Sequence, residues 1–151
     1  MMSELNVVAE RTIDAPAAKI YEVVANYNEQ HPRILPPSFS DWKVEQGGIG
    51  AGTVVSFTVK TPGSSRRFRV QVAEPEPGRL LTEADTLSTM VTTFQVDPNA
   101  GGSRVHIESS WQSAGGFGGL MERLFAPRVM RKMYADELDR LECYVQKGSA
   151  E

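Results

Sequence analysis

Apolar side chains recur at every second position between residues 39 and 111, in short runs separated by glycine- and proline-rich turns. This period of two is typical of β-strands, whose alternate side chains point to opposite faces of a sheet. Strands separated by such short turns pair as an antiparallel meander with one apolar face and one solvated face. Together with the runs at 7–13, 39–46 and 79–85, the pattern predicts about seven strands.

Two short helices are predicted directly after the first strand. Asp14 and Pro16 favour the start of a helix, and apolar residues then recur three and four positions apart. We therefore expect a helix over about residues 16–27. A second short helix over 28–35 would end at the two prolines that follow it.

The C-terminal part of the chain has helical spacing as far as about Gln146. A helix of roughly 28 residues is roughly 42 Å long, which is the length of a whole domain of this size. Pro127 interrupts it, and the apolar stripes before and after the proline point in different directions. We therefore expect a kink or break at about residues 124–127. The glycine-rich segment 115–119 before the helix is expected to be a flexible hinge.

Composition bounds the class of protein. The 151 residues suit one domain, expected over 1–151 with an ordered core at about 5–147. The net charge of -3, from Lys+Arg 16 against Asp+Glu 19, argues against a nucleic-acid binder. One cysteine, Cys143, and two histidines leave no Cys/His zinc cluster. Without a secretory signal or a long apolar run, we expect a cytoplasmic protein with no transmembrane segment.

The order of elements resembles the START-like (SRPBCC) superfamily, specifically its polyketide cyclase/dehydrase and lipid-transport type. The resemblance rests on three stretches: residues 13–16 followed by 20–24, the Gly50-Ala51-Gly52 turn before the strand 53–60, and residues 124–130. It implies an α+β helix-grip fold, in which a curved antiparallel sheet surrounds the long C-terminal helix and encloses a deep apolar cavity. Members of the family bind lipids, hormones, polyketides or other hydrophobic molecules, and no universal catalytic residue can be carried over.

Strand parity and the helix stripes predict which residues would form the cavity wall. The candidates are Leu35, Phe39, Trp42, Phe57, Phe68, Val70, Thr92, Phe94, Ile107, Ser109, Trp111, Met121, Phe125, Met130, Met133 and Tyr134. A filled core would show the same periodicity. The bent sheet and the methionine-rich wall, which adapts to ligands of varied shape, favour a cavity.

The opening is expected between residues 28–39 and the hinge, with His31 and Arg33 as polar contacts at the mouth. The simpler interpretation of His31 is an exposed loop residue, and the alternative is a general acid or base. His106 is interpreted as a solvated residue on the polar side of its strand. The basic cluster 66–69 is either a wet strand face or a site for an acidic head group.

The function favoured by these observations is binding of a hydrophobic small molecule by a monomer or homodimer, with no metal and no obligate cofactor. A cofactor-independent polyketide cyclase or dehydratase is the alternative, and it would need ionisable groups converging deep inside the cavity. Strand parity places only Thr92, Ser109 and Tyr134 there. A third class is a regulatory or protein-interaction domain of co-chaperone or toxin-like type, which a filled interior and an exposed apolar patch would favour.

Overall fold

The computed structural model describes residues 3–113 and 116–150 of the chain. Side chains near both ends of the last helix, including that of Met121, lie outside this description. The elements in chain order are β1 Ser3–Ile13, α1 Ala17–Ala25, the short 3-10 helix η1 His31–Ile34, β2 Phe39–Gln46, β3 Val54–Thr61, β4 Ser64–Glu76, β5 Leu80–Asp85, β6 Val91–Asn99, β7 Gly102–Ser113 and α2 Gly116–Ala150.

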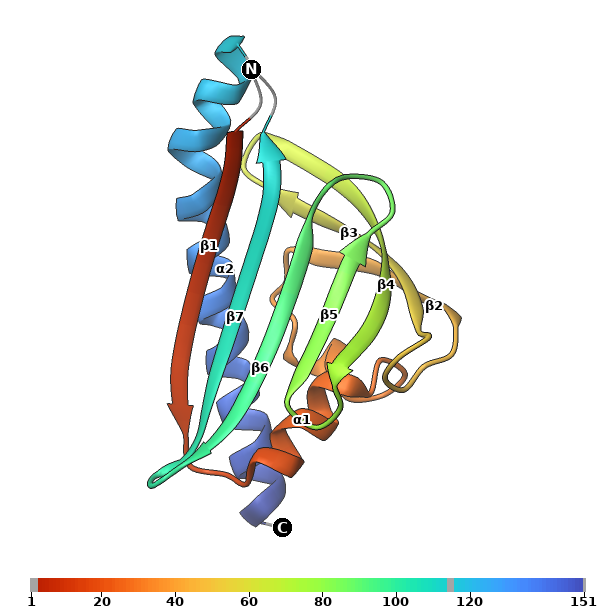
Figure 1. The fold of residues 1–151 in the computed structure, drawn as a ribbon, viewed down its shortest axis with the longest axis vertical. Coiled ribbons are helices and arrows are strands. Elements are labelled where there is room, and N and C mark those ends of the chain that lie inside the picture. The colour runs from red at the N-terminus through yellow and green to blue at the C-terminus, as the bar shows by residue number, and fades with distance from the viewer. Residues whose placement is uncertain (1–2, 114–115, 151) are drawn as a thin grey trace.

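The strands form one antiparallel sheet of seven strands, in the order β1-β7-β6-β5-β4-β3-β2. The first strand therefore closes onto the last, and the rest of the sheet is the meander expected from the turn signals. Figure 1 shows α2 running alongside β1 and β7, while the β2–β4 half of the sheet curls away from it. The predicted helix-grip architecture is confirmed.

α2 packs against β1 and β7 through one apolar stripe on its C-terminal half. The stripe consists of Tyr134, Leu138, Leu141 and Val145, and each of these is 6% exposed or less. Their spacing of four, three and four residues keeps them on one face of a helix. Because this stripe meets strands at one side of the sheet, α2 leaves much of the inner face of the other strands uncovered.

Of the kink or break predicted at Pro127, the break does not occur. α2 continues from Gly116 to Ala150 with Pro127 inside it, and Figure 1 shows one unbroken helix. The two apolar stripes do point in different directions, but they do not need to meet the same core. Leu124 and Phe125 before the proline are 53% and 52% exposed, whereas the stripe after it is buried. Near solvent, the backbone carbonyl that loses its partner to the proline can be hydrated.

The glycine-rich segment 115–119, expected to be a hinge, belongs to α2 from residue 116 onward. Residues 116–119 are the first residues of α2, while residues 114 and 115 lie outside the described part of the chain. Glycine costs about 1 kcal/mol per residue in a helix relative to alanine, but adding residues to an existing helix is far easier than nucleating one. The long helix that follows therefore extends through the glycines.

The two short helices lie close to their predicted positions and close one end of the sheet. α1 is tied to the meander by Tyr21, whose hydroxyl donates to Glu74 Oε2 at 2.6 Å. The other oxygen of Glu74 accepts the backbone N–H of Ala51 at 2.7 Å. This contact holds the glycine turn, in which Gly50 and Gly52 have positive φ values of 63° and 91°, against the end of the sheet.

The unequal packing of α2 predicts the effect of two leucine substitutions. Leu141 is 1% exposed, so Leu141→Ala should lower the free energy of unfolding by about 2–5 kcal/mol. Leu124→Ala on the same helix, at a half-exposed position, should change it by no more than about 0.5 kcal/mol. Urea denaturation followed by circular dichroism measures both, and equal losses would contradict this packing.

Candidate functional site

A cavity of about 740 Å³ lies between the inner face of the sheet and α2. This volume is within the usual range for small-molecule sites, about 300–1,000 Å³. The sheet side is lined by consecutive aromatic rings. The ring of Phe57 lies 5.4 Å from those of Phe39 and Trp42, and 5.5 Å from that of Phe68. Phe57 and Phe68 are direct cross-strand partners in β3 and β4, which places both on the concave face.

The opening of the cavity is marked by its exposed lining residues. These are the β3–β4 turn at 62–64, Arg66 and Phe125. From there the helix side continues inward through small and flexible apolar residues: Ala126, Val129, Met130 and Met133. These exposed residues place the entrance between the β3–β4 turn and the N-terminal half of α2, whereas the sequence predicted it between residues 28–39 and the segment 115–119.

His31 lies at the inner end of the cavity, not at its mouth. The residue is 2% exposed, so the interpretation as an exposed loop residue is wrong. The ring stacks on Tyr27 at 4.6 Å and on Trp42 at 5.7 Å. Its Nδ1 lies 2.6 Å from the carbonyl oxygen of Val24, which only accepts, so Nδ1 carries a proton. The polar residues around His31 suggested solvent, but η1 folds back beneath α2 and buries the ring.

Arg33, the other expected contact at the mouth, does not line the cavity. It is exposed, and its Nε donates to the carbonyl oxygen of Glu29 at 3.0 Å.

Two glutamates face the inner end of the cavity. Glu83 of β5 accepts a hydrogen bond from the Tyr27 hydroxyl at 2.6 Å, and its carboxylate lies 3.9 Å from His31 Nε2. Glu137 of α2 is 3% exposed, and its Oε2 has no hydrogen-bond partner among the described residues. Burial raises the pKa of the Glu137 carboxyl well above its usual value, and the charges of Glu83 and Asp136 raise it further.

Sequence reasoning missed both glutamates as cavity residues. Glu83 lies in a run with apolar residues at two consecutive positions, Leu80 and Leu81, so alternation does not assign its face. Glu137 did carry a signal, because it lies three residues after Tyr134 and four before Leu141, on the buried stripe. An acid at a core position of an amphipathic helix is rare unless it has a partner or a function.

A chain of hydroxyl groups lies beside these acids. Thr92 Oγ1 and Ser109 Oγ are 2.5 Å apart, and Ser109 is also hydrogen-bonded to the Tyr134 hydroxyl. Burial raises the pKa of Tyr134, although its hydrogen bonds to Ser109 and Thr92 oppose the rise. Tyr134 therefore stays protonated at neutral pH and can act only as a hydrogen-bonding group there.

The predicted wall residues whose side chains the structure describes divide into two groups. Those on the cavity surface are Leu35, Phe39, Trp42, Phe57, Phe68, Val70, Thr92, Phe94, Phe125, Met130, Met133 and Tyr134. Ile107, Ser109 and Trp111 of β7 are buried but do not line the cavity, because α2 covers that strand. Met121 lies outside the described side chains.

The basic cluster of β4 is mostly used within the sheet. Arg67 donates to Thr58 Oγ1 at 2.9 Å, and Arg69 pairs with Glu45 at 3.1 Å. Only Arg66 reaches the cavity, where its guanidinium lies 5.4 Å from the centre of the Phe68 ring.

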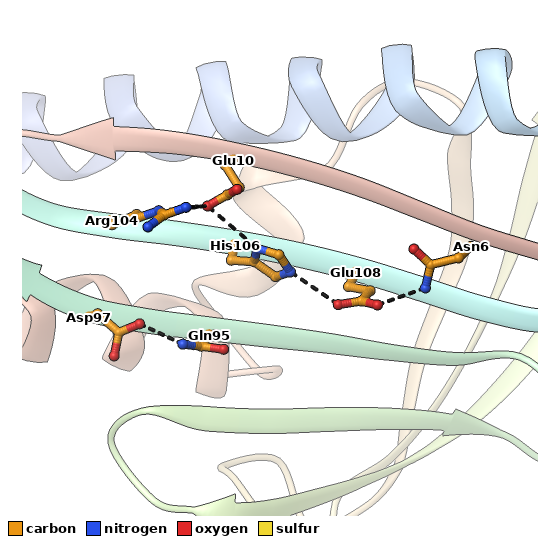
Figure 2. Close-up of polar contacts among 7 residues, drawn as sticks. All are labelled: Asn6, Glu10, Gln95, Asp97, Arg104, His106 and Glu108. Atoms are coloured by element: carbon orange, nitrogen blue, oxygen red, sulfur yellow. Dashed lines mark hydrogen bonds and ion pairs between the residues drawn. The ribbon is translucent and has the colours of Figure 1, made fainter.

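His106 belongs to a polar network on the outer face of the sheet, drawn in Figure 2. Its Nε2 lies 3.1 Å from Glu108, which also accepts from Asn6 at 2.7 Å, and its Nδ1 lies 3.5 Å from Glu10. The hydrogen bond from Arg104, followed by the one from His106, lowers the pKa of Glu10, and the hydrogen bonds from Asn6 and His106 lower the pKa of Glu108. The cross-strand contacts support the interpretation of His106 as a residue of the solvated face.

The described part of the structure lacks two further kinds of feature. Among the side chains it describes, no group of three or more His, Cys, Asp or Glu residues is arranged to hold a metal ion. Over the same described residues, none of the helices combines the length and the apolar character needed to cross a membrane.

The sequence matches the polyketide cyclase/dehydrase and lipid transport family over residues 4–146. The chain therefore belongs to this SRPBCC family. No curated protein shows a significant match. The solution structure of the KanY protein is similar over 95% of this chain and 99% of its own, with 29% identity and a TM-score of 0.85.

Two further solved structures share the fold. A protein from Thermus thermophilus is 20% identical over 96% of this chain and 99% of its own, with a TM-score of 0.79. A point mutant of Thalictrum norcoclaurine synthase, solved in complex with a transition-state analogue, is 16% identical over 99% of this chain and 98% of its own, with a TM-score of 0.75.

The raised pKa of Glu137 predicts how stability depends on pH. A carboxyl whose pKa is higher in the folded than in the unfolded protein costs stability as pH rises from its unfolded pKa, about 4.3, through the folded value. Glu137→Gln removes this cost. The variant should be more stable than the wild type by about 1–3 kcal/mol at pH 8, and the difference should shrink towards pH 4.

Urea denaturation of both proteins between pH 4 and pH 8 measures the difference. Asp139→Asn is the matched control, because it removes an exposed carboxylate of the same helix that is ion-paired with Arg11. A stability difference for Glu137→Gln that does not change with pH would contradict the assignment.

Proposed function

We propose that this protein binds a hydrophobic small molecule in the cavity between the sheet and α2. The carrying observation is the cavity itself, about 740 Å³ in volume and open at one end. Its wall is dominated by aromatic and methionine side chains, which bury a large apolar area and tolerate ligands of different shape. Membership of a family described by polyketide and lipid chemistry supports the same function.

A substitution that fills the cavity tests the proposal. Val70 is 4% exposed and lines the cavity, so Val70→Phe adds a ring to a space that can take it without overpacking the core. A panel of fatty acids, sterols and aromatic polyketides is first screened by thermal shift. Titration calorimetry should then show the best ligand binding to Val70→Phe at least about tenfold more weakly than to the wild type.

Gln71→Phe is the matched control, because Gln71 is the next residue of β4 and is exposed on the opposite face. It should leave the affinity unchanged. A panel without any ligand, or equal losses in the two variants, would contradict internal binding.

A cyclase- or dehydratase-type enzyme is the second candidate, and one observation favours it. Three ionisable groups converge at the inner end of the cavity, namely His31, Glu83 and Glu137. Strand parity predicted only hydroxyl groups there. In such a reaction Glu83 as a carboxylate would remove a proton next to a ketone, and protonated Glu137 would donate one to the carbonyl oxygen under attack. The regulatory or interaction class is not favoured, because the interior contains a cavity rather than a filled core.

The state of the ligand after incubation separates binding from catalysis. If the protein is an enzyme, a poly-β-ketone thioester analogue should be recovered either as a cyclised isomer of the same mass, which chromatography separates, or as a dehydrated product, whose loss of water is visible by mass spectrometry. Glu83→Gln should then lower the turnover at least about a hundredfold. Recovery of unchanged analogue from the wild type, together with measurable binding, would leave binding alone as the function.

A further inference from the structure

The ionisable side chains that line the cavity are unevenly distributed. The acids are Glu83, Asp85, Glu122 and Glu137, and the bases are His31 and Arg66. Arg66 is exposed at the opening, whereas Asp85 and Glu137 are buried and the side chain of Glu83 is 12% exposed. The inner end of the cavity is therefore acidic, and its only base among the described residues is His31.

Most polar groups at this inner end already have partners within the protein. The Tyr27 hydroxyl donates to Glu83, and the Tyr134 hydroxyl is bonded to Ser109. Asp85 accepts from the backbone N–H of Arg69 at 2.9 Å and from Ser88 at 2.6 Å. His31 Nδ1 is used by the carbonyl of Val24 at 2.6 Å.

Glu137 is the exception among the described residues of the cavity. Its Oε2 is buried and has no hydrogen-bond partner there. Leaving a buried carboxyl oxygen unpaired is costly, and a carboxyl group accepts hydrogen bonds more readily than it donates them. The free position at the inner end is therefore one that a hydrogen-bond donor on a ligand would satisfy.

A positively charged donor fits this position better than a neutral one. The negative charge of Glu83 acts on Glu137, so the two carboxyl groups oppose each other's ionisation. A cation between them would remove that repulsion and could donate to both. The rings of Tyr27, His31 and Trp42 are stacked within 19° of parallel beside the acids. An aromatic wall of this kind also favours a cation or its adjoining methylene groups.

We infer that the ligand of this cavity is an apolar molecule carrying a protonated amine, which binds between Glu137 and Glu83 while the apolar body lies against the aromatic wall. The inference rests on the proposed function, because it identifies the chemical class of the molecule that occupies the same cavity. It adds an orientation, with the amine at the inner end and the apolar end towards Phe125 and the β3–β4 turn.

Three probes that share one naphthylbutyl body and differ only in the terminal group test the inference: the amine, the alcohol and the carboxylate. Titration calorimetry at pH 7 should show the amine binding at least about tenfold more tightly than the alcohol, and the carboxylate most weakly. Glu137→Gln should reduce the amine to the affinity of the alcohol, while the affinity of the alcohol changes by less than about threefold.

Asp139→Asn is again the matched control, because it removes one negative charge from an exposed position of α2, where the carboxylate is paired with Arg11. This variant should keep the preference for the amine. Retention of the preference in Glu137→Gln would overturn the role of Glu137.

The remaining outcomes separate this inference from the proposed function. If the alcohol binds as tightly as the amine, the cavity binds apolar molecules but the amine assignment is wrong. If the carboxylate binds best, the assignment is also wrong and Arg66 at the opening is the polar contact. If none of the three probes binds, this inference is overturned, while the proposed function is decided separately by the panel of fatty acids, sterols and aromatic polyketides.

Discussion

The cavity follows from the way one helix packs on a sheet that is wider than the helix can cover. The buried stripe of α2 packs against β1 and β7 and consists of four residues, Tyr134, Leu138, Leu141 and Val145. Because the sheet curves away from these strands, α2 leaves the inner faces of β3 to β5 largely uncovered (Figure 1). Side chains from both layers approach this space without filling it, and a volume of about 740 Å³ remains.

The open cavity lowers the stability of the fold, and packing elsewhere has to offset that loss. Interiors are normally packed as densely as organic crystals, so an open volume of this size forfeits many van der Waals contacts. The layer where α2 packs against β1 and β7 offsets this loss. Its residues are fully buried, as Ile13, Val105 and Leu138 show, each 1% exposed or less. Loss of stability at binding sites is a common consequence of selection for function rather than for stability.

The inner end of the cavity lowers stability for a second reason, because it buries carboxyl groups. Glu83 is stabilised by Tyr27 and lies near His31, but Glu137 has no such partner for Oε2 among the described residues. A leucine at residue 137 would suit the neighbouring stripe of Tyr134, Leu138 and Leu141 far better. A buried acid on that stripe therefore fits the proposed ligand contact better than a role in folding.

The sequence by itself determined the architecture, because hydrophobic periodicity and turn residues act locally. The alternation at Val55, Phe57 and Val59 defined a strand with an apolar face, and the glycine and proline turns defined its ends. The same parity identified most of the aromatic wall, since residues on the concave face of β3 and β4 must share one side of the sheet. The pairing of the first strand with the last was not predicted from the sequence and comes from the structure.

Only the tertiary structure decided how far α2 covers the sheet and which polar groups meet inside. Ile107 and Trp111 have the same parity as Phe94, yet they lie beneath α2, because the position of the helix across the sheet is a long-range property. His31 has a polar side chain and polar neighbours in the sequence, but the packing of η1 beneath α2 buries it. The meeting of His31, Glu83 and Glu137 joins residues 52 and 54 positions apart, which no local pattern encodes.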